Sequence, residues 1–247
     1  MTKALAKTLA ALLAAMAGAV LALNGSRVLH ASTRVLVASV VTSAALAAIT
    51  TIGSAWGEWR GRRLAERREL AAISLEAVAW AIVDQVGHGL DYRDLGVAAY
   101  RLRRRWWWPF GTRLVRVERV RPSRRPVASH VSWRPGKGVI GACVAKGEVV
   151  AVDVAQMYRD LGSPTEQEWE SVPAEIRQGL SYAEYLDVRD KYAVVVAAPI
   201  IDDAGPSATV VGCVALDGPE GRFADLQSDE VLGLLNFTAS TLLHQVR

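Results

Sequence analysis

The sequence predicts an α+β protein in which two N-terminal transmembrane helices and a connecting helix precede an antiparallel sheet with flanking helices. Three observations carry this prediction. Two long apolar runs lie near the N-terminus, at residues 4–23 and 35–56. A helical repeat of apolar residues comes next, and short apolar runs separated by turn-forming Gly and Pro follow it. We therefore divide the 247 residues into a membrane hairpin (1–56), a basic connecting helix (57–89) and a folded domain (90–247).

Each apolar run is long enough to cross a hydrocarbon layer of about 30 Å. The second run carries no charge in 22 residues, and the first contains Lys7. The first run also fits a cleaved secretory signal, which would leave the topology of the mature chain unchanged. Arginines cluster directly after the second run, so the positive-inside bias predicts a multi-pass protein of a bacterial inner (plasma) membrane with its C-terminal domain in the cytoplasm.

The helical repeat after the second run predicts one long helix over residues 58–86, which the glycines at 87 and 89 end. Its apolar residues recur at steps of three and four: Leu64, Leu70, Ile73, Ala77, Trp80 and Val83. Such a stripe is expected to pack on its own domain. A contact with a second subunit is the alternative.

Basic charge gathers in the first half of the chain. Residues 1–125 contain 20 basic and 8 acidic side chains, whereas residues 126–247 contain 9 basic and 17 acidic ones. Two strand-like runs, at 97–107 and 112–120, form a hairpin whose arginines surround three tryptophans. We expect this pattern to contact lipid headgroups; a solvated hairpin without a partner comes next, and nucleic acid is the least favoured. The predicted membrane-surface residues are Arg60, Arg62, Arg63, Arg103, Arg105, Trp106, Trp107 and Trp108.

The rest of the domain alternates between helices and strands. A Pro-Gly turn leads into a short helix within residues 134–146, and a strand follows at 148–154. Residues 155–191 form a polar excursion with helical pieces. Two apolar strands, at 192–201 and 208–216, then form a second hairpin, and a final helix covers about residues 228–245.

This order of elements resembles the GAF domain, a family of small-molecule-binding sensory modules. The residues that carry the resemblance are Gly136 to Gly141, the strand up to Asp153, the two late strands, and the helix that begins at Asp229 and Glu230. The resemblance implies a six-stranded antiparallel sheet with helices on its faces and a ligand pocket on one side. Leu216 and Asp217 stand where cyclic-nucleotide-binding members carry Asn and Lys, so the chain departs from that pattern.

Two features suggest where a small ligand binds. The glycine-rich turn before the short helix could offer free N–H groups to an anion, with a tight structural turn as the alternative. Aromatic residues of the excursion could line a pocket or fill the core. The predicted ligand-binding residues are Trp133, Arg134, Lys137, Gly138, Asp153, Tyr182 and Tyr185.

Enzymatic chemistry has little support in the sequence. The four histidines are isolated from one another and from any nucleophile, and no phosphate-binding loop or kinase signature occurs. Cys143 and Cys213 lie in apolar surroundings without metal-ligand spacing, so we expect buried free thiols. We predict no catalytic residues, no metal site and no enzyme activity, and the sequence identifies no cofactor.

The function that these features favour is a membrane-anchored cytoplasmic sensory module that binds a small molecule or nucleotide, or recruits a partner signalling protein, as a homodimer. Two alternatives belong to other classes. The small residues of the membrane segments would let helices approach closely, as a ligand-activated effector that permeabilises the membrane requires. The other is a dimerising scaffold that has lost its ligand.

Overall fold

The computed structural model describes residues 15–16, 18–19, 22, 32–103, 111–123, 127 and 129–247. The contacts between residues divide the chain into two units, Met1–Ala65 and Glu66–Arg247. One continuous helix, α2 (Thr33–Val86), contributes residues to both units, so the second apolar run and the connecting helix belong to a single element.

In the first unit, the apolar part of α2 is exposed. Among the described residues, α2 is the one helix long and apolar enough to cross a membrane, and none of its most apolar stretch is buried against protein. The prediction of two transmembrane helices is therefore supported for one only. The first predicted span, residues 4–23, lies mostly outside the described residues, and the multi-pass arrangement rests on the sequence alone.

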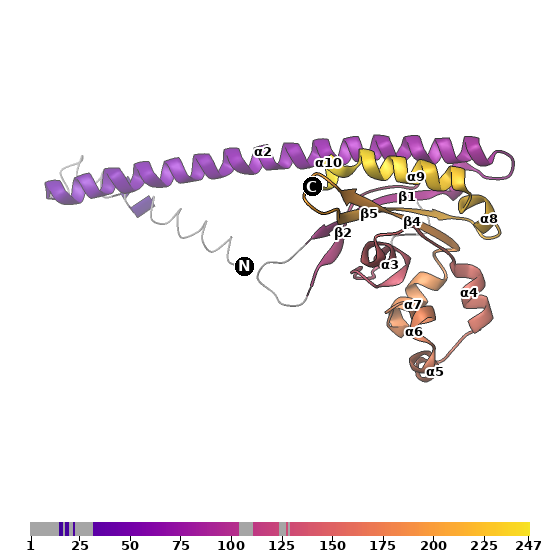
Figure 1. Ribbon diagram of the computed structural model, residues 1–247. Helices are drawn as coiled ribbons and strands as arrows, with labels where there is room; N and C mark the ends of the chain where they lie inside the picture. The colour runs from indigo at the N-terminus through magenta and orange to yellow at the C-terminus, as the bar shows by residue number, and fades with distance from the viewer. Residues whose placement is uncertain are drawn as a thin grey trace. The chain divides into compact units, whose positions relative to one another are not determined.

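The second unit is built on an antiparallel sheet with the strand order β2-β1-β5-β4-β3 (Figure 1). Its strands are β1 (Gly96–Arg103), β2 (Arg113–Val120), β3 (Val150–Asp153), β4 (Val194–Asp202) and β5 (Thr209–Gly218). Both predicted hairpins are present, although the tip of the first, residues 104–110, lies outside the described residues.

The described residues form five strands, not the six that the resemblance implies. The chain after β2 approaches that strand, where the N–H of Leu114 donates to the carbonyl of Trp133 at 2.9 Å. Three prolines at 122, 126 and 135 interrupt this part of the sequence. Because proline has no N–H to donate to a ladder, a regular sixth strand is disfavoured there.

Helices cover both faces of the sheet (Figure 1). One face carries α3 (Gly138–Lys146), α4 (Val154–Leu161), α5 (Glu166–Ser171), α6 (Ala174–Arg177) and α7 (Tyr182–Arg189). The other carries the C-terminal part of α2 with α8 (Phe223–Leu226), α9 (Asp229–Thr241) and α10 (Leu243–Val246). A 3₁₀ turn, η1 (Tyr92–Asp94), leads from α2 to β1.

The strands are apolar on both faces because each face lies under helices. In β4, Val194 and Val196 point into the core shared with α2 and α9, while Val195 and Ala197 point into the core shared with α3 and α7. β5 alternates in the same way. This double burial explains why these strands read as continuous apolar runs rather than alternating ones.

The prediction for the inner face of α2 is wrong for most of its residues. Leu64, Leu70, Ile73 and Trp80, expected to pack inward, are exposed. Val83 is the large member of the predicted stripe that packs against the core. The buried side chains of the helix are instead Ala71, Leu75, Val78, Ala79 and Ile82. The helix therefore has two apolar faces, and the sequence pattern picked out the one that faces away from the sheet.

Candidate functional site

A cavity of about 40 Å³ lies where the sheet meets α3, α4 and α7. Its walls are mostly apolar: Val139 and Ile140 come from α3, Val195 from β4 and Ala215 from β5. One water molecule requires roughly 10–15 Å³ measured in this way. The cavity thus has room for about three waters, or for a compact ligand of a few heavy atoms.

Two buried tyrosines line this cavity. Tyr100 comes from β1 and Tyr158 from α4. Burial raises the pKa of both phenols above the ordinary value, and the nearby Tyr185 raises the pKa of Tyr158 further. Both groups are therefore neutral O–H groups at physiological pH, and each can donate as well as accept a hydrogen bond.

Trp133 and Gly138 form an adjoining part of the wall. Gly138 has a φ of +61°, and a Cβ added to it would lie 2.5 Å from Cζ3 of Trp133. The indole therefore lies directly against the first residue of α3. Glycine is needed here for two reasons: its backbone is left-handed, and the ring occupies the space of a side chain.

An ion pair forms another part of the wall. Asp217, at the end of β5, binds the guanidinium of Arg121, and Nη2 of Arg119 lies 4.0 Å from Oδ1 of the same carboxylate. Burial and then repulsion by Arg119 lower the pKa of Arg121 to about 10. Arg119 and Asp217 are not among the ligand-binding residues that the sequence predicts. The sequence feature that could have indicated Asp217 is its position directly after the apolar run of β5.

The glycine-rich turn before α3 uses its polar groups internally. The N–H groups of Gly136, Lys137 and Gly138 donate to the carbonyls of Gly141, Arg134 and Gln178, at 2.7, 3.0 and 2.8 Å respectively. An anion at this turn would have to displace one of these hydrogen bonds. The side chain of Arg134 is not part of the cavity wall.

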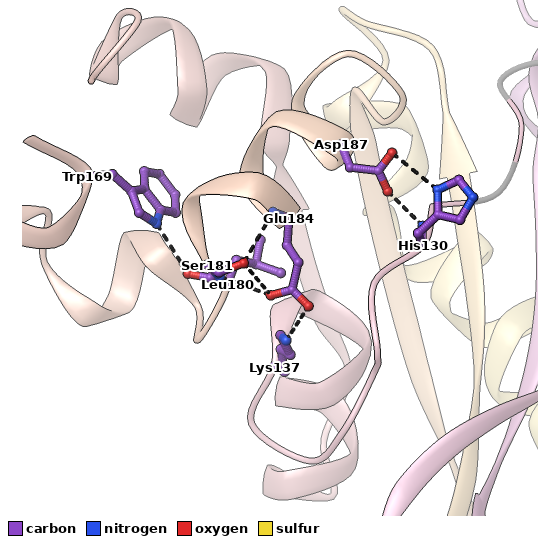
Figure 2. A network of polar contacts seen from close by, with 7 residues as sticks. All are labelled: His130, Lys137, Trp169, Leu180, Ser181, Glu184 and Asp187. Carbon is purple, nitrogen blue, oxygen red and sulfur yellow. Dashed lines mark hydrogen bonds and ion pairs between the residues drawn. The ribbon is translucent and has the colours of Figure 1, made fainter. Parts of the chain in front are cut away.

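Lys137 is only 8% exposed, and its Nζ donates to Oε1 of Glu184 at 2.5 Å (Figure 2). Glu184 also accepts from the N–H of Ser181, which makes it part of the capping box of α7. Burial raises the pKa of Glu184, but the hydrogen bonds from Lys137 and Ser181 outweigh it and hold the pKa below its usual value. This contact fastens the N-terminus of α3 to α7.

The aromatic residues of the excursion pack on one another. Tyr185 stacks on Trp169 with ring centroids 4.2 Å apart, and Tyr158 meets its edge at 4.9 Å. Nε1 of Trp169 donates to the carbonyl of Leu180 at 3.2 Å (Figure 2), and Tyr182 donates to that of Pro164. These rings fill the core beneath α5–α7 and support Tyr158, while Tyr182 and Tyr185 themselves lie outside the cavity wall.

Asp153 has a local structural role. Its carboxylate accepts from the N–H of Gln156 at 2.9 Å and so caps α4. Of the seven predicted ligand-binding residues, Trp133 and Gly138 line the cavity, whereas Arg134, Lys137, Asp153, Tyr182 and Tyr185 do not.

The predicted membrane-surface residues fall in two places. Arg60, Arg62 and Arg63 are exposed on α2, where Arg60 lies over Trp56 and Arg63 over Trp59, with 5.2 and 4.0 Å to the ring centroids. Arg103 is exposed at the end of β1. Arg105, Trp106, Trp107 and Trp108 lie outside the described residues.

Groups that could support catalysis or metal binding are sparse in the described part of the chain. Within it, no cluster of three or more His, Cys, Asp or Glu residues could hold a metal ion. Cys143 and Cys213 are buried free thiols, as expected, and burial next to Cys143 raises the pKa of Cys213.

Comparison with known proteins identifies no family by sequence: no protein-family model matches the chain, and no curated protein does. The chain is similar in structure to solved structures, of which three are described here. A GAF domain is 13% identical, with a TM-score of 0.37 over 71% of this chain and 88% of its own. NreA from Staphylococcus aureus, mutated in its nitrate binding site, is 12% identical, with a TM-score of 0.38 over 64% of this chain and 92% of its own.

Free methionine-R-sulfoxide reductase from Neisseria meningitidis, in complex with its substrate, is 17% identical, with a TM-score of 0.36 over 72% of this chain and 89% of its own. With identities below 25% and TM-scores below 0.5, none of these similarities establishes what the present chain binds or does.

Proposed function

We propose that this protein is a membrane-anchored sensory module that binds a compact small molecule in the cavity beneath α3. The cavity is the observation that carries the proposal. Its apolar wall would exclude water from the ligand, and the hydroxyls of Tyr100 and Tyr158 would orient it, which is the usual composition of a small-molecule site.

The size of the cavity narrows the class of ligand. A volume of about 40 Å³ favours a molecule of a few heavy atoms over a nucleotide. The arrangement of the walls also gives binding a route to the rest of the domain. A ligand that pressed on Trp133 would act on α3, which Lys137 connects to α7 through Glu184.

Membrane anchoring is the second part of the proposal. The exposed apolar part of α2 supports it, because an unburied stretch of this length and composition is stable within a hydrocarbon layer. Arg60, Arg62 and Arg63 follow this stretch and would keep the second unit on the cytoplasmic side. The module would then report ligand binding to a partner protein at the inner surface.

A pair of glycine variants tests the ligand site. Gly138→Ala places a methyl group 2.5 Å from the Trp133 ring, so we expect it to displace the wall and abolish binding. Gly136→Ala is the matched control: its φ of +80° imposes a similar backbone strain, but its Cβ would meet no atom within 4 Å.

The measurement is native mass spectrometry of the full chain extracted in detergent. A small molecule retained by the unmodified chain and by the Gly136→Ala variant, but lost from Gly138→Ala, would support the site. Equal retention by both variants would place the ligand elsewhere. A chain that retains nothing, and whose unfolding temperature no small-molecule library shifts, would refute the proposal.

A further inference from the structure

A groove of about 320 Å³ lies between β2 and the segment 129–133, and we call it the β2 groove. Among the described residues, β2 is the edge strand on this side of the sheet. The N–H of Leu114 donates to the carbonyl of Trp133, but the neighbouring prolines disfavour a regular ladder along the rest of the strand. A hollow is therefore left where a sixth strand would otherwise pair.

The charged residues that line the β2 groove are basic. Arg113 and Arg116 belong to its wall, which contains no Asp or Glu. Both residues are exposed, and no carboxylate of the described residues lies within ion-pair distance of either guanidinium. Asp187 accepts from the N–H of His130 beside the wall, but Lys191 balances its charge. The groove is therefore electrostatically suited to an anion.

The strand pairing places Arg116 on the side of the sheet that faces α3. Arg116 is the cross-strand partner of Tyr100, which belongs to the core beneath α3. Residues directly opposite each other in an antiparallel pair point to the same face. The pKa of Tyr100 agrees with this placement: burial raises it, whereas the charge of Arg116 acts to lower it. The guanidinium of Arg116 therefore lies on the phenol side of the sheet, at the groove.

The composition of the wall suits a phosphate group. A phosphate monoester has three strong acceptor oxygens and a charge of about −1.5 to −2. The two guanidiniums can bind it through paired N–H groups, and the hydroxyls of Ser129 and Ser132 offer further donors. The volume lies near the lower end of the range of about 300–1,000 Å³ for small-molecule sites. The groove therefore has room for an organic part, against which Trp133 presents an apolar ring.

The β2 groove and the cavity beneath α3 are different sites with a common aromatic wall. Tyr100, Trp133 and Tyr192 line both of them, whereas Arg113 and Arg116 line the groove alone. The cavity of about 40 Å³ is too small for a phosphate ester. Binding in the groove does not depend on the compact ligand of the proposed function, so the two proposals can fail separately.

We propose that the β2 groove binds a phosphate-bearing small molecule. Arg113 and Arg116 hold the phosphate, and the organic part lies against Trp133. A soluble phosphate ester and a lipid headgroup with a terminal phosphate share this chemistry. Because the ring of Trp133 also lines the cavity, a molecule in the groove would change the shape of the cavity wall, which gives the domain a second input.

Calorimetric titration of the full chain in detergent with phenyl phosphate tests the groove. We expect the unmodified chain to bind, and Arg116→Gln to raise the dissociation constant about tenfold or more, as for the loss of hydrogen bonds to a charged group. Arg116→Lys keeps the charge but not the planar fork, so its affinity should fall between the two. Arg134→Gln is the matched control, because Arg134 is exposed and lines neither the groove nor the cavity.

Because Arg116 is exposed, Arg116→Gln should keep the unfolding temperature of the unmodified chain. An unmodified chain that does not bind phenyl phosphate at millimolar concentration, or an Arg116→Gln variant with unchanged affinity, would overturn the proposal. So would an Arg134→Gln variant that weakens binding as much as Arg116→Gln, since the general surface charge would then attract the anion. Phenol, which lacks the phosphate, should bind much more weakly; equal affinity for phenol would contradict recognition of the phosphate.

Two vesicle preparations distinguish the sources of the phosphate. The full chain is reconstituted in phosphatidylcholine vesicles that contain either phosphatidic acid, a phosphate monoester, or phosphatidylserine, a diester, at equal surface charge. A lower affinity for phenyl phosphate in the phosphatidic acid vesicles would show that a lipid headgroup competes for the groove, and Arg116→Gln should remove this difference. Equal affinities in the two preparations would assign the groove to a soluble ester. A difference that persists in Arg116→Gln would place the lipid effect elsewhere and contradict binding of a headgroup in the groove.

Discussion

At the scale of single residues, the contacts beneath α3 show how one charged group can be buried at low cost. The Nζ of Lys137 donates to the carboxylate of Glu184, which also accepts from the N–H of Ser181. The lysine of the Gly-Lys-Gly motif therefore has a structural role, because it holds α3 to α7 through Glu184. Gly138 and the indole of Trp133 that lies against it are the parts of this region that line the cavity.

The charge of Glu184 can be tested without removing its cap. Glu184→Gln keeps an oxygen for the capping box, which accepts Gln as well as Glu, but leaves the charge of Lys137 without its partner. We expect the free energy of unfolding to fall by about 1.5–3 kcal/mol. Glu168→Gln is the control, since Glu168 makes the same capping contacts with Thr165 on the surface of α5. Glu168→Gln should lower the free energy of unfolding by less than Glu184→Gln does, as denaturant unfolding measures it.

The difference in stability between the unmodified chain and Glu184→Gln should depend on pH in a definite direction. The pKa of Glu184 is lowered in the folded chain, so its contribution is fully present above the ordinary glutamate pKa and is lost as the pH falls through the lower, folded value. The gap between the unmodified chain and Glu184→Gln should therefore narrow on acidification. A gap that stays constant to low pH would show that shape, and not charge, accounts for the loss.

The two buried tyrosines should make the stability of the chain decrease at alkaline pH. Folding raises the pKa of Tyr100 and Tyr158, so the unfolded chain releases their protons first. Stability should be complete below about pH 10, the ordinary tyrosine pKa, and decrease above it by up to about 1.4 kcal/mol per pH unit for each residue. The double variant Tyr100→Phe, Tyr158→Phe should show a shallower decrease in alkaline unfolding experiments. An unchanged slope would contradict this account.

At the scale of elements, the sequence predicts the strands well because their signal is local. β4 and β5 are apolar runs bounded by turn residues, and the structure forms both. The start of α9 after Ser228 follows from capping chemistry in the same way. The faces of α2 could not be assigned, because both carry apolar residues at helical spacing and only the tertiary fold decides which one meets the sheet.

The cavity could not be predicted from the sequence either, because the tertiary fold decides which residues line it. Its wall joins Tyr100, Tyr158, Val195 and Asp217, which are far apart along the chain and meet through strand pairing and helix packing. Each is ordinary in its local context. The conspicuous aromatic residues, Tyr182 and Tyr185, fill the core beside it. The location of the cavity is therefore set by the packing of the sheet against α3, and aromatic residues that stand out in the sequence do not indicate it.

Two truncations on α2 test the reassigned face. Leu75 is fully buried, so Leu75→Ala should lower the free energy of unfolding by about 2–5 kcal/mol. Ile73→Ala, two residues away, should change it by less than about 0.5 kcal/mol, because Ile73 is 59% exposed. Denaturant unfolding of the full chain in detergent measures both. The reverse order would restore the inward orientation predicted from the sequence.

At the scale of the whole molecule, the apolar part of α2 should determine where the chain resides. Ile49→Arg places a charge in the middle of the second apolar run, at a cost of about 2.5–3.5 kcal/mol for insertion into the bilayer. Leu64→Arg is the matched control, an aliphatic-to-arginine change on the same helix beyond the run. The measurement is the fraction of the chain that resists carbonate extraction, together with the accessibility of a reporter fused after Arg247.

We expect Leu64→Arg to stay in the membrane with the reporter inside. Ile49→Arg should either be extracted or expose the reporter outside the cell. If both variants remain membrane-embedded with the reporter inside, the second apolar run is not a span.

The burial of Leu75, Val78 and Ile82 in the sheet has a practical consequence for cutting the protein into pieces. A fragment that starts at residue 90, the boundary that the composition suggests, would strip the sheet of one covering helix and leave valines of β1 and β4 bare. Such a piece should precipitate or coalesce through its uncovered side. A fragment that starts shortly before Glu66 retains this helix, and it is the shortest piece that we expect to remain soluble without lipid or detergent.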